Sequence, residues 1–140
     1  MPISALRRAT ASVNEQLNHS SPYDAIALMS IPVICRHVVG FANAQTDVDL
    51  ARVACALERY HLANGEYPAA LDDLATQFIS PMPHDVINGQ PLRYRRTADG
   101  KFALYSVGWN ETDDGGIVAF TKNGALDHEH GDWVWQYPAR

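Results

Sequence analysis

The sequence is poor in cysteine and in positive charge, and each scarcity excludes a class of protein. Its two cysteines, Cys35 and Cys55, give neither a disulfide framework nor the spacing of a metal site, and we expect both to be buried apolar thiols. Lysine and arginine together number 11, against 16 acidic residues. Such a chain lacks the positive field that nucleic-acid binding requires, so we expect no nucleic-acid partner. The basic cluster Arg93, Arg95 and Arg96 predicts a solvated strand face.

Long apolar runs are also missing, and this argues against a leader or a membrane span in the chain. Residues 1–13 have no apolar core and contain two arginines, so no signal peptide is visible. Residues 25–39 are the most apolar stretch, but a proline, an arginine and a histidine interrupt it before ~18 apolar residues accumulate. We therefore expect no membrane-spanning segment.

The start of the chain predicts a short helical extension. Residues 4–17 carry apolar side chains at near-helical spacing. Asp24 can cap a further short helix. At Pro32 we expect a new helix to begin, because proline is tolerated in the first turn. These features divide the chain into a helical extension of residues 1–31 and a domain of residues 32–140.

Residues 32–64 predict one long helix. No proline follows its first turn, and Asn64-Gly65 suits its end because glycine has no Cβ to oppose the left-handed conformation. The alternative is a break near Gln45, with Thr46 as a cap. The apolar stripe expected to face the sheet comprises Ile34, Val38, Phe41, Val48, Ala51, Cys55 and Leu62, widened by Leu50, Val53, Ala54, Leu57 and Tyr60.

The second half of the chain predicts an antiparallel sheet. Short runs with strand character alternate with glycine turns, at residues 92–96, 102–107, 117–121 and 133–137. Residues 127–131 predict a charged loop. An antiparallel sheet needs a covering layer on one face. The expected fold class is therefore α+β, with the long N-terminal helix packed on a three- to four-stranded antiparallel sheet and an extra N-terminal helical segment.

A series of short motifs runs from the helix end to the last strand. They are Leu57-Glu58-Arg59-Tyr60, Gly65-Glu66-Tyr67-Pro68, Leu71 with Leu74, Pro83 with Asp85, Gly89-Gln90-Pro91-Leu92-Arg93-Tyr94, Tyr105-Ser106-Val107-Gly108, and Asp113-Asp114-Gly115-Gly116 with Asp132. In this order they resemble the major pseudopilin of type II secretion systems and the type IV pilin-like superfamily around it. The resemblance covers about residues 50–135. The family's leader and membrane-embedded helix have no counterpart here, and Asp85-Val86-Ile87 departs from the family's aspartate-proline-aromatic pattern.

The resemblance implies a pilin-like fold and a non-catalytic role. It indicates a structural or interaction module of the cell envelope, periplasmic or otherwise extracytoplasmic and linked to type II secretion, whose protein partners are copies of itself or other envelope subunits. The alternative is a stand-alone extracytoplasmic binding domain of a larger protein unrelated to secretion, and a metal-dependent enzyme is a remote third. We expect no enzyme activity, because the sequence contains no nucleophile elbow, phosphate loop or zinc-protease helix.

Members of the family bind calcium in the loop after the second strand, and the matching loop here is rich in oxygen donors. Calcium takes about 6–8 oxygen ligands from carboxylates, amides and carbonyls. Carried over by position, the candidate calcium ligands are Asn110, Asp113, Asp114 and Asp132. The alternative is an acidic surface turn with no ion.

Four late aromatic residues are candidates for a partner surface, namely Trp109, Trp133, Trp135 and Tyr137. Period-two spacing places the last three on one face of the closing strand. Aromatic side chains anchor many protein interfaces. For Trp133 and Trp135 the alternative is that they fill the core between helix and sheet.

Overall fold

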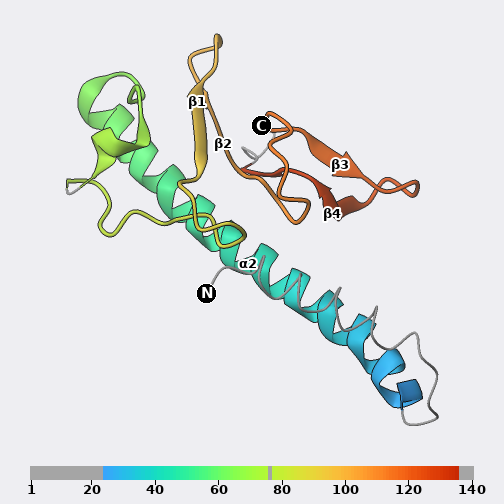
Figure 1. The fold of residues 1–140 in the computed structure, drawn as a ribbon. Helices are drawn as coiled ribbons and strands as arrows, with labels where there is room; N and C mark the ends of the chain where they lie inside the picture. Colours follow the sequence, from blue (N-terminus) through green and yellow to red (C-terminus); the bar gives the residue numbers. More distant parts are fainter. Residues whose placement is uncertain (1–23, 76, 136–140) are drawn as a thin grey trace.

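The computed structural model describes residues 24–75 and 77–135, and over these residues the fold is α+β (Figure 1). The predicted helix at residues 4–17 and the candidate residue Tyr137 lie outside the described residues. The elements in chain order are α2 (Asp24–Asn64), η1 (Leu71–Leu74), β1 (Arg93–Arg96), β2 (Phe102–Ser106), β3 (Val118–Phe120), β4 (Leu126–Gly131) and β5 (Trp133–Val134).

Helix α2 is continuous over 41 residues, which confirms one long helix and excludes the break near Gln45. Thr46, the residue expected to cap a second helix, is buried within α2. The helix begins at Asp24 and continues through Pro32, so the helix start predicted at Pro32 is wrong. Half of the residues from Asp24 to Ile31 are alanine, leucine or methionine, which are strong helix formers, and one missing amide does not end the helix there. The division of the chain at residue 32 stays a prediction.

The predicted end of α2 is confirmed. Asn64 is the last helical residue, and Gly65 follows with a φ of 81°, in the left-handed region. The Gly65 amide donates to the His61 carbonyl at 2.8 Å, which satisfies one of the last helical carbonyls. None of the helices in the described part of the chain is long and apolar enough to cross a membrane.

The strands form two antiparallel sheets rather than the single sheet that we expected. One has the order β1-β2-β5, and the other pairs β3 with β4. The charged loop predicted at residues 127–131 is wrong, because these residues belong to β4. Most side chains of β4 are exposed, so the strand has no apolar alternation by which the sequence could have indicated it.

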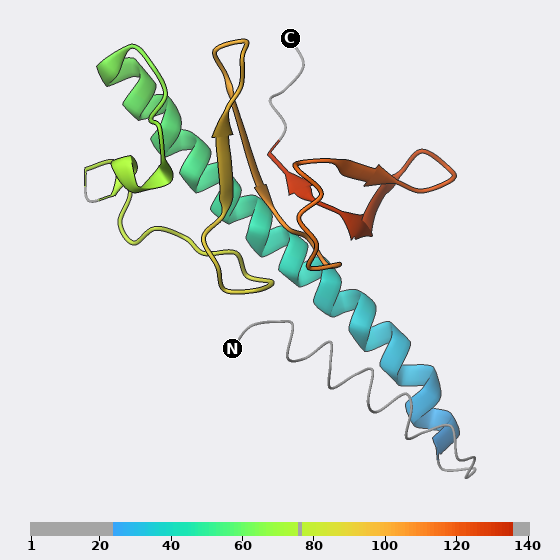
Figure 2. The same ribbon diagram turned by 45° about the horizontal axis from the view of Figure 1, so that its top comes forward.

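The three-stranded sheet lies across the C-terminal half of α2, and the β3–β4 hairpin lies beside it (Figures 1 and 2). Strands β2 and β4 both contact α2. The N-terminal half of α2 extends beyond the strands in both views. Within the described residues, the strands reach this half of the helix near its C-terminal end, where Ala42 packs with Trp133.

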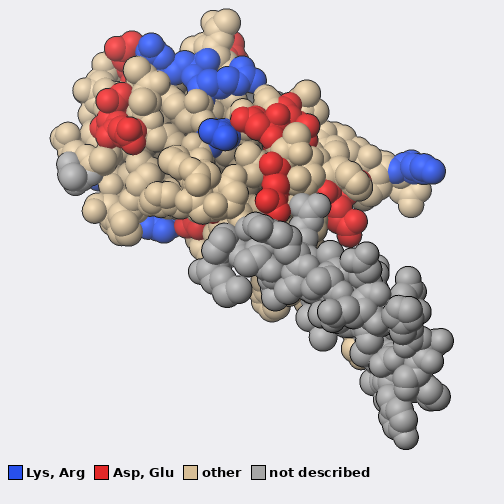
Figure 3. Space-filling model, viewed as in Figure 1, with Lys and Arg blue, Asp and Glu red and all other residues tan. Residues whose placement is uncertain are grey.

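Strand β1 presents the arginine cluster to solvent, as its sequence predicts. Arg93, Arg95 and Arg96 are exposed. Arg93 Nε lies 3.2 Å from Asp113 Oδ2, and Arg96 Nη1 lies 3.4 Å from Glu66 Oε2. Figure 3 shows basic and acidic side chains side by side on this face of the molecule. The cluster is thus a charge-balanced surface.

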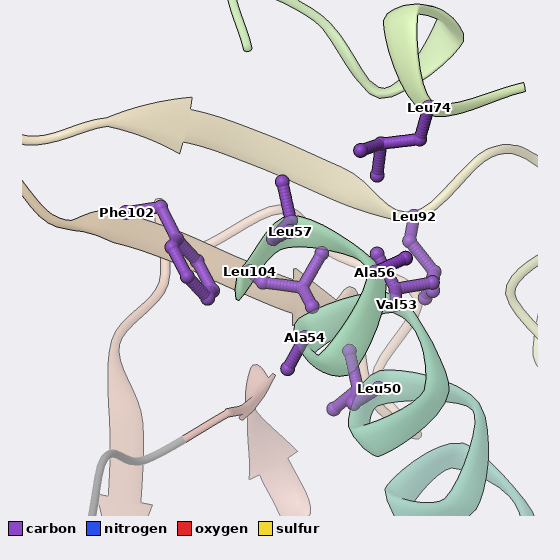
Figure 4. Close-up of a cluster of buried hydrophobic side chains, with 9 residues drawn as sticks. All are labelled: Leu50, Val53, Ala54, Ala56, Leu57, Leu74, Leu92, Phe102 and Leu104. Carbon is purple, nitrogen blue, oxygen red and sulfur yellow. The ribbon is translucent and has the colours of Figure 1, made fainter. Parts of the chain in front are cut away.

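The main core lies between α2, η1 and the β1–β2 hairpin (Figure 4). Its leucines are almost completely buried, and burying each one contributes about 2 kcal/mol. A second, smaller cluster contains Ala42, Ile87 and Trp133. The main core is formed by Leu50, Val53, Ala54, Ala56, Leu57, Leu74, Leu92, Phe102 and Leu104.

The face of α2 that packs on the strands differs from the predicted stripe. Phe41, Val48 and Leu62 are 75%, 55% and 83% exposed, and Cys55 is exposed as well, so its expected burial is wrong. The side chain of Cys35 lies outside the described part. Apolar residues surround much of α2, so periodicity alone did not select the packed face. Four residues expected only to widen the stripe are buried, namely Leu50, Val53, Ala54 and Leu57, and so are Ala42 and Ala56, which the prediction did not include.

Candidate functional site

The loop between β2 and β3 brings three of the four predicted calcium ligands together. Asn110 Nδ2 donates to Asp114 Oδ2 at 3.0 Å. Asp132 reaches the same loop from the start of β5, and its two carboxylate oxygens accept the amides of Asp114 at 3.3 Å and Gly116 at 2.6 Å. Asp132 is thus the residue that ties the loop to the sheet.

Asp113, the fourth predicted ligand, points elsewhere. Its Oδ1 accepts the Tyr105 hydroxyl at 3.1 Å, and its Oδ2 pairs with Arg93. Burial, followed by the hydrogen bond to Asp113, raises the pKa of the Tyr105 phenol. Asp113 Oδ1 also accepts the Gly115 amide within the loop at 3.1 Å, so Asp113 joins the loop to the β1–β2 hairpin.

The carboxylates of this loop all have protein hydrogen-bond or ion-pair partners. Asp132 is 2% exposed and both of its oxygens are engaged by backbone amides, while the other carboxylates bind protein donors. Burial raises the pKa of the Asp132 carboxyl. Within residues 24–75 and 77–135, no three His, Cys, Asp or Glu side chains are grouped to hold a metal. The contacts favour the acidic surface turn, and calcium binding stays a prediction from the resemblance.

A second buried carboxylate, Asp85, has a structural role that the sequence analysis did not assign. Asp85 is 2% exposed, and its oxygens accept the amides of Ile87 at 2.9 Å and Val107 at 3.1 Å. It therefore holds the segment before β1 against the end of β2. A hydrogen bond from the Ile87 amide to the side chain of Asp85, two residues earlier, is typical of an aspartate turn. The aspartate before this turn was the feature from which the sequence could have indicated this role.

The aromatic residues proposed as a partner surface pack against the two cores. Trp133 is 5% exposed and donates its indole Nε1–H to the His128 carbonyl at 3.2 Å. Trp135 is half-buried against the main core, and Trp109 is half-buried against the smaller cluster. These contacts favour core filling, the alternative that the sequence left open.

The exposed apolar residues of α2 form a surface that we call the α2 outer face: Phe41, Val48, Cys55 and Leu62. Each member follows the previous one by seven residues. A seven-residue interval is close to two helical turns, so the four side chains lie along one side of the helix. Ala44 is exposed between the first two members. Among the described residues, no strand covers these four side chains.

A cleft lies between α2 and the β3–β4 hairpin, and we call it the α2–β4 cleft. Its inner part has a volume of about 280 Å³ and continues into an outer part of about 520 Å³. Both parts are lined by Asn43 of α2 and by Leu126, Asp127 and His128 of β4. The inner part also includes Asp47, whose carboxyl pKa is raised by burial, an effect partly offset by nearby His128.

Comparison with known proteins adds no family assignment. No protein-family model matches the chain, and no curated protein matches it. The pseudopilin resemblance therefore depends on the motifs themselves. Part of that motif series is tied together in space, because the Tyr67 hydroxyl donates to Glu58 Oε1 at 2.8 Å and the Tyr94 hydroxyl donates to the Pro68 carbonyl at 2.8 Å.

Proposed function

We propose that this chain is a non-catalytic, pseudopilin-like structural and interaction module of the cell envelope, and that it associates with a second copy through the α2 outer face. The exposed apolar strip on α2 carries this proposal. The long helix packed on an antiparallel sheet supports the pilin-like part, as do the contacts among the motif residues. Calcium stabilisation is left out, because the candidate oxygens bind protein donors.

The spacing of the outer face supports a helix as the partner. Phe41 is 75% exposed and Leu62 is 83% exposed, although each is a large apolar side chain that gains by leaving water. A seven-residue interval keeps one strip of a helix facing another helix over several turns. An extended strand or a flat surface would not require that interval.

The same interval supports a second copy of this chain as the partner. Two copies that lie parallel and in register bring the same residue of each helix together at every seventh position. Val48 would then meet Val48 of the second copy, and Cys55 would meet Cys55. The small side chain of Ala44 permits a close approach of the two helices between the Phe41 and Val48 layers.

Cysteine cross-linking tests both the surface and its direction. In a background with Cys35→Ser, mild oxidation should link two copies through Cys55, because a disulfide forms only when the Cα atoms lie within about 7 Å. Non-reducing electrophoresis would show the dimer, and sedimentation equilibrium would measure the association constant. Val48→Glu should weaken association at least ten-fold, because it places two carboxylates opposite each other at the centre of the strip.

The matched control is Ala98→Glu, which adds the same charge at an exposed position of the β1–β2 hairpin. It should leave both cross-linking and association unchanged. A chain that stays monomeric at millimolar concentration would overturn the proposal. So would equal losses in Val48→Glu and Ala98→Glu, since the effect would then come from net charge and not from the outer face.

The second candidate function is a stand-alone binding domain unrelated to secretion, and the α2–β4 cleft favours it. A concave site lined by aromatic, apolar and a few polar groups is the usual form of a ligand pocket. The genes next to this one separate the two candidates, since secretion-system components there would support the first and their absence the second.

A further inference from the structure

Charged residues lie along both edges of the α2 outer face, and the first of these edges is basic. Arg52 follows Val48 by four residues, and Arg59 follows Cys55 by four. A step of four residues turns about 40° past one full helical turn, so both arginines lie on the same side of the outer face. Both are exposed. We call this side the basic edge.

The opposite edge of the outer face is acidic. Asp47 comes directly before Val48, and Glu58 follows Cys55 by three residues. These steps turn about 100° and 60° in the other sense, so both carboxylates lie on the side away from the arginines, which we call the acidic edge. Asp47 is exposed, whereas Glu58 is half-buried and accepts from the Tyr67 hydroxyl. Asp47 is therefore the carboxylate that a partner reaches more readily.

Arg52 is the corresponding member of the basic edge. Arg59 is held within the chain, because its Nη1 donates to the Phe78 carbonyl at 3.3 Å and its guanidinium lies 5.9 Å from the centre of the Phe78 ring. Arg52 Nη1 donates to Asp49 Oδ1 at 3.2 Å, and 48% of the Arg52 side chain is still exposed. A guanidinium has several N–H donors, so Arg52 can bind a second carboxylate.

The opposite charges of the two edges select the direction in which two copies pair. In a parallel pair with two-fold symmetry, the basic edge of each helix lies against the acidic edge of the other. In an antiparallel pair, edges of the same kind face each other, and their like charges oppose association. Parallel pairing in register also places the residue before the Val48 layer beside the residue four positions after that layer in the second copy.

We propose that Asp47 of each copy pairs with Arg52 of the other, and that these two ion pairs fix the parallel register of the dimer. This inference rests on the proposed association through the α2 outer face and names the residues that give it direction. A partner helix must carry the same two edges, and a second copy of this chain does. The two-fold axis repeats the contact, so one substitution changes both pairs.

Charge reversal tests this proposal. Asp47→Lys and Arg52→Glu should each lower the association constant about three- to ten-fold in sedimentation equilibrium, because each replaces two exposed ion pairs by two like-charge contacts. The double variant Asp47→Lys/Arg52→Glu should recover the parent value, since it reverses both members of each pair. The matched control is Asp72→Lys, which makes the same charge change at an exposed position of η1 and should leave association unchanged.

Mixing the double variant with the parent chain tests the direction of pairing. In a Cys35→Ser background, disulfide exchange in a glutathione buffer lets the Cys55-linked dimers redistribute, and mass spectrometry counts parent, variant and mixed dimers. Parallel pairing should give fewer mixed dimers than the half expected for random pairing. The reason is that each contact between positions 47 and 52 joins like charges in the mixed dimer.

The outcomes separate this proposal from the proposed function. A parent chain that stays monomeric would overturn both. A parent chain whose association is lost in Val48→Glu but unchanged in both charge reversals would overturn this proposal alone. The same conclusion would follow from equal losses in Asp47→Lys and Asp72→Lys, from a folded double variant that does not recover, or from mixed dimers that reach the random half.

Discussion

Replacing Gly108 by alanine is expected to destabilise the fold at the junction of its two sheets. Gly108 follows β2 with a φ of +67°, where an L-residue costs about 1–2 kcal/mol. A Cβ at this position would lie 2.3 Å from the carbonyl oxygen of Gly131, the last residue of β4. That carbonyl belongs to the backbone, so it cannot move aside by a side-chain rotation.

This overlap is expected to add a second cost to that of the left-handed conformation. Forcing an extra carbon into packed structure costs about 1–3 kcal/mol. Adding the left-handed term of about 1–2 kcal/mol gives a total loss of about 2–5 kcal/mol for Gly108→Ala. A loss of this size is a large fraction of the stability of an ordinary domain.

Gly124→Ala separates the two terms. Gly124 has a φ of +78°, but a Cβ there would have no heavy atom within 4 Å. This variant should therefore show the conformational term alone. Urea unfolding with linear extrapolation measures both free energies. Equal losses in the two variants would refute the argument, because they would show that the contact with Gly131 contributes nothing.

Two more predictions concern buried polar groups. Asp85→Asn should lower the free energy of unfolding, measured in urea, by about 2 kcal/mol. The reason is that the new side-chain amide would face one of the two backbone amides from which the carboxylate now accepts hydrogen bonds. The control Asp72→Asn should change the free energy of unfolding by less than about 0.5 kcal/mol. Burial raises the pKa of Tyr94 to about 12, so the unfolded chain loses this proton first and stability should fall from about pH 10 to 12. Absorbance at 295 nm should show late-ionising phenols, because the pKa of Tyr105 is raised as well, and Tyr94→Phe should remove one of them. Loss of an early-ionising phenol instead would contradict the assignment.

The sequence by itself determined the elements whose signals are local. Asn64-Gly65 marks the end of α2 because only the adjacent backbone conformation matters there. The glycine turns marked the hairpins for the same reason. The acidic loop after β2 was also found, together with Asp132 as its distant partner.

Tertiary structure alone decided which surfaces are covered. Apolar residues lie on more than one side of α2. Packing against η1 and the β1–β2 hairpin buried Leu50, Val53 and Leu57, whereas Phe41 and Leu62 stayed in solvent. Strand β4 is held by backbone hydrogen bonds to β3, and its side-chain pattern does not indicate this pairing. The α2–β4 cleft is the space between the helix and the β3–β4 hairpin. The sequence did not predict this cleft, because it did not predict that the hairpin forms a separate sheet.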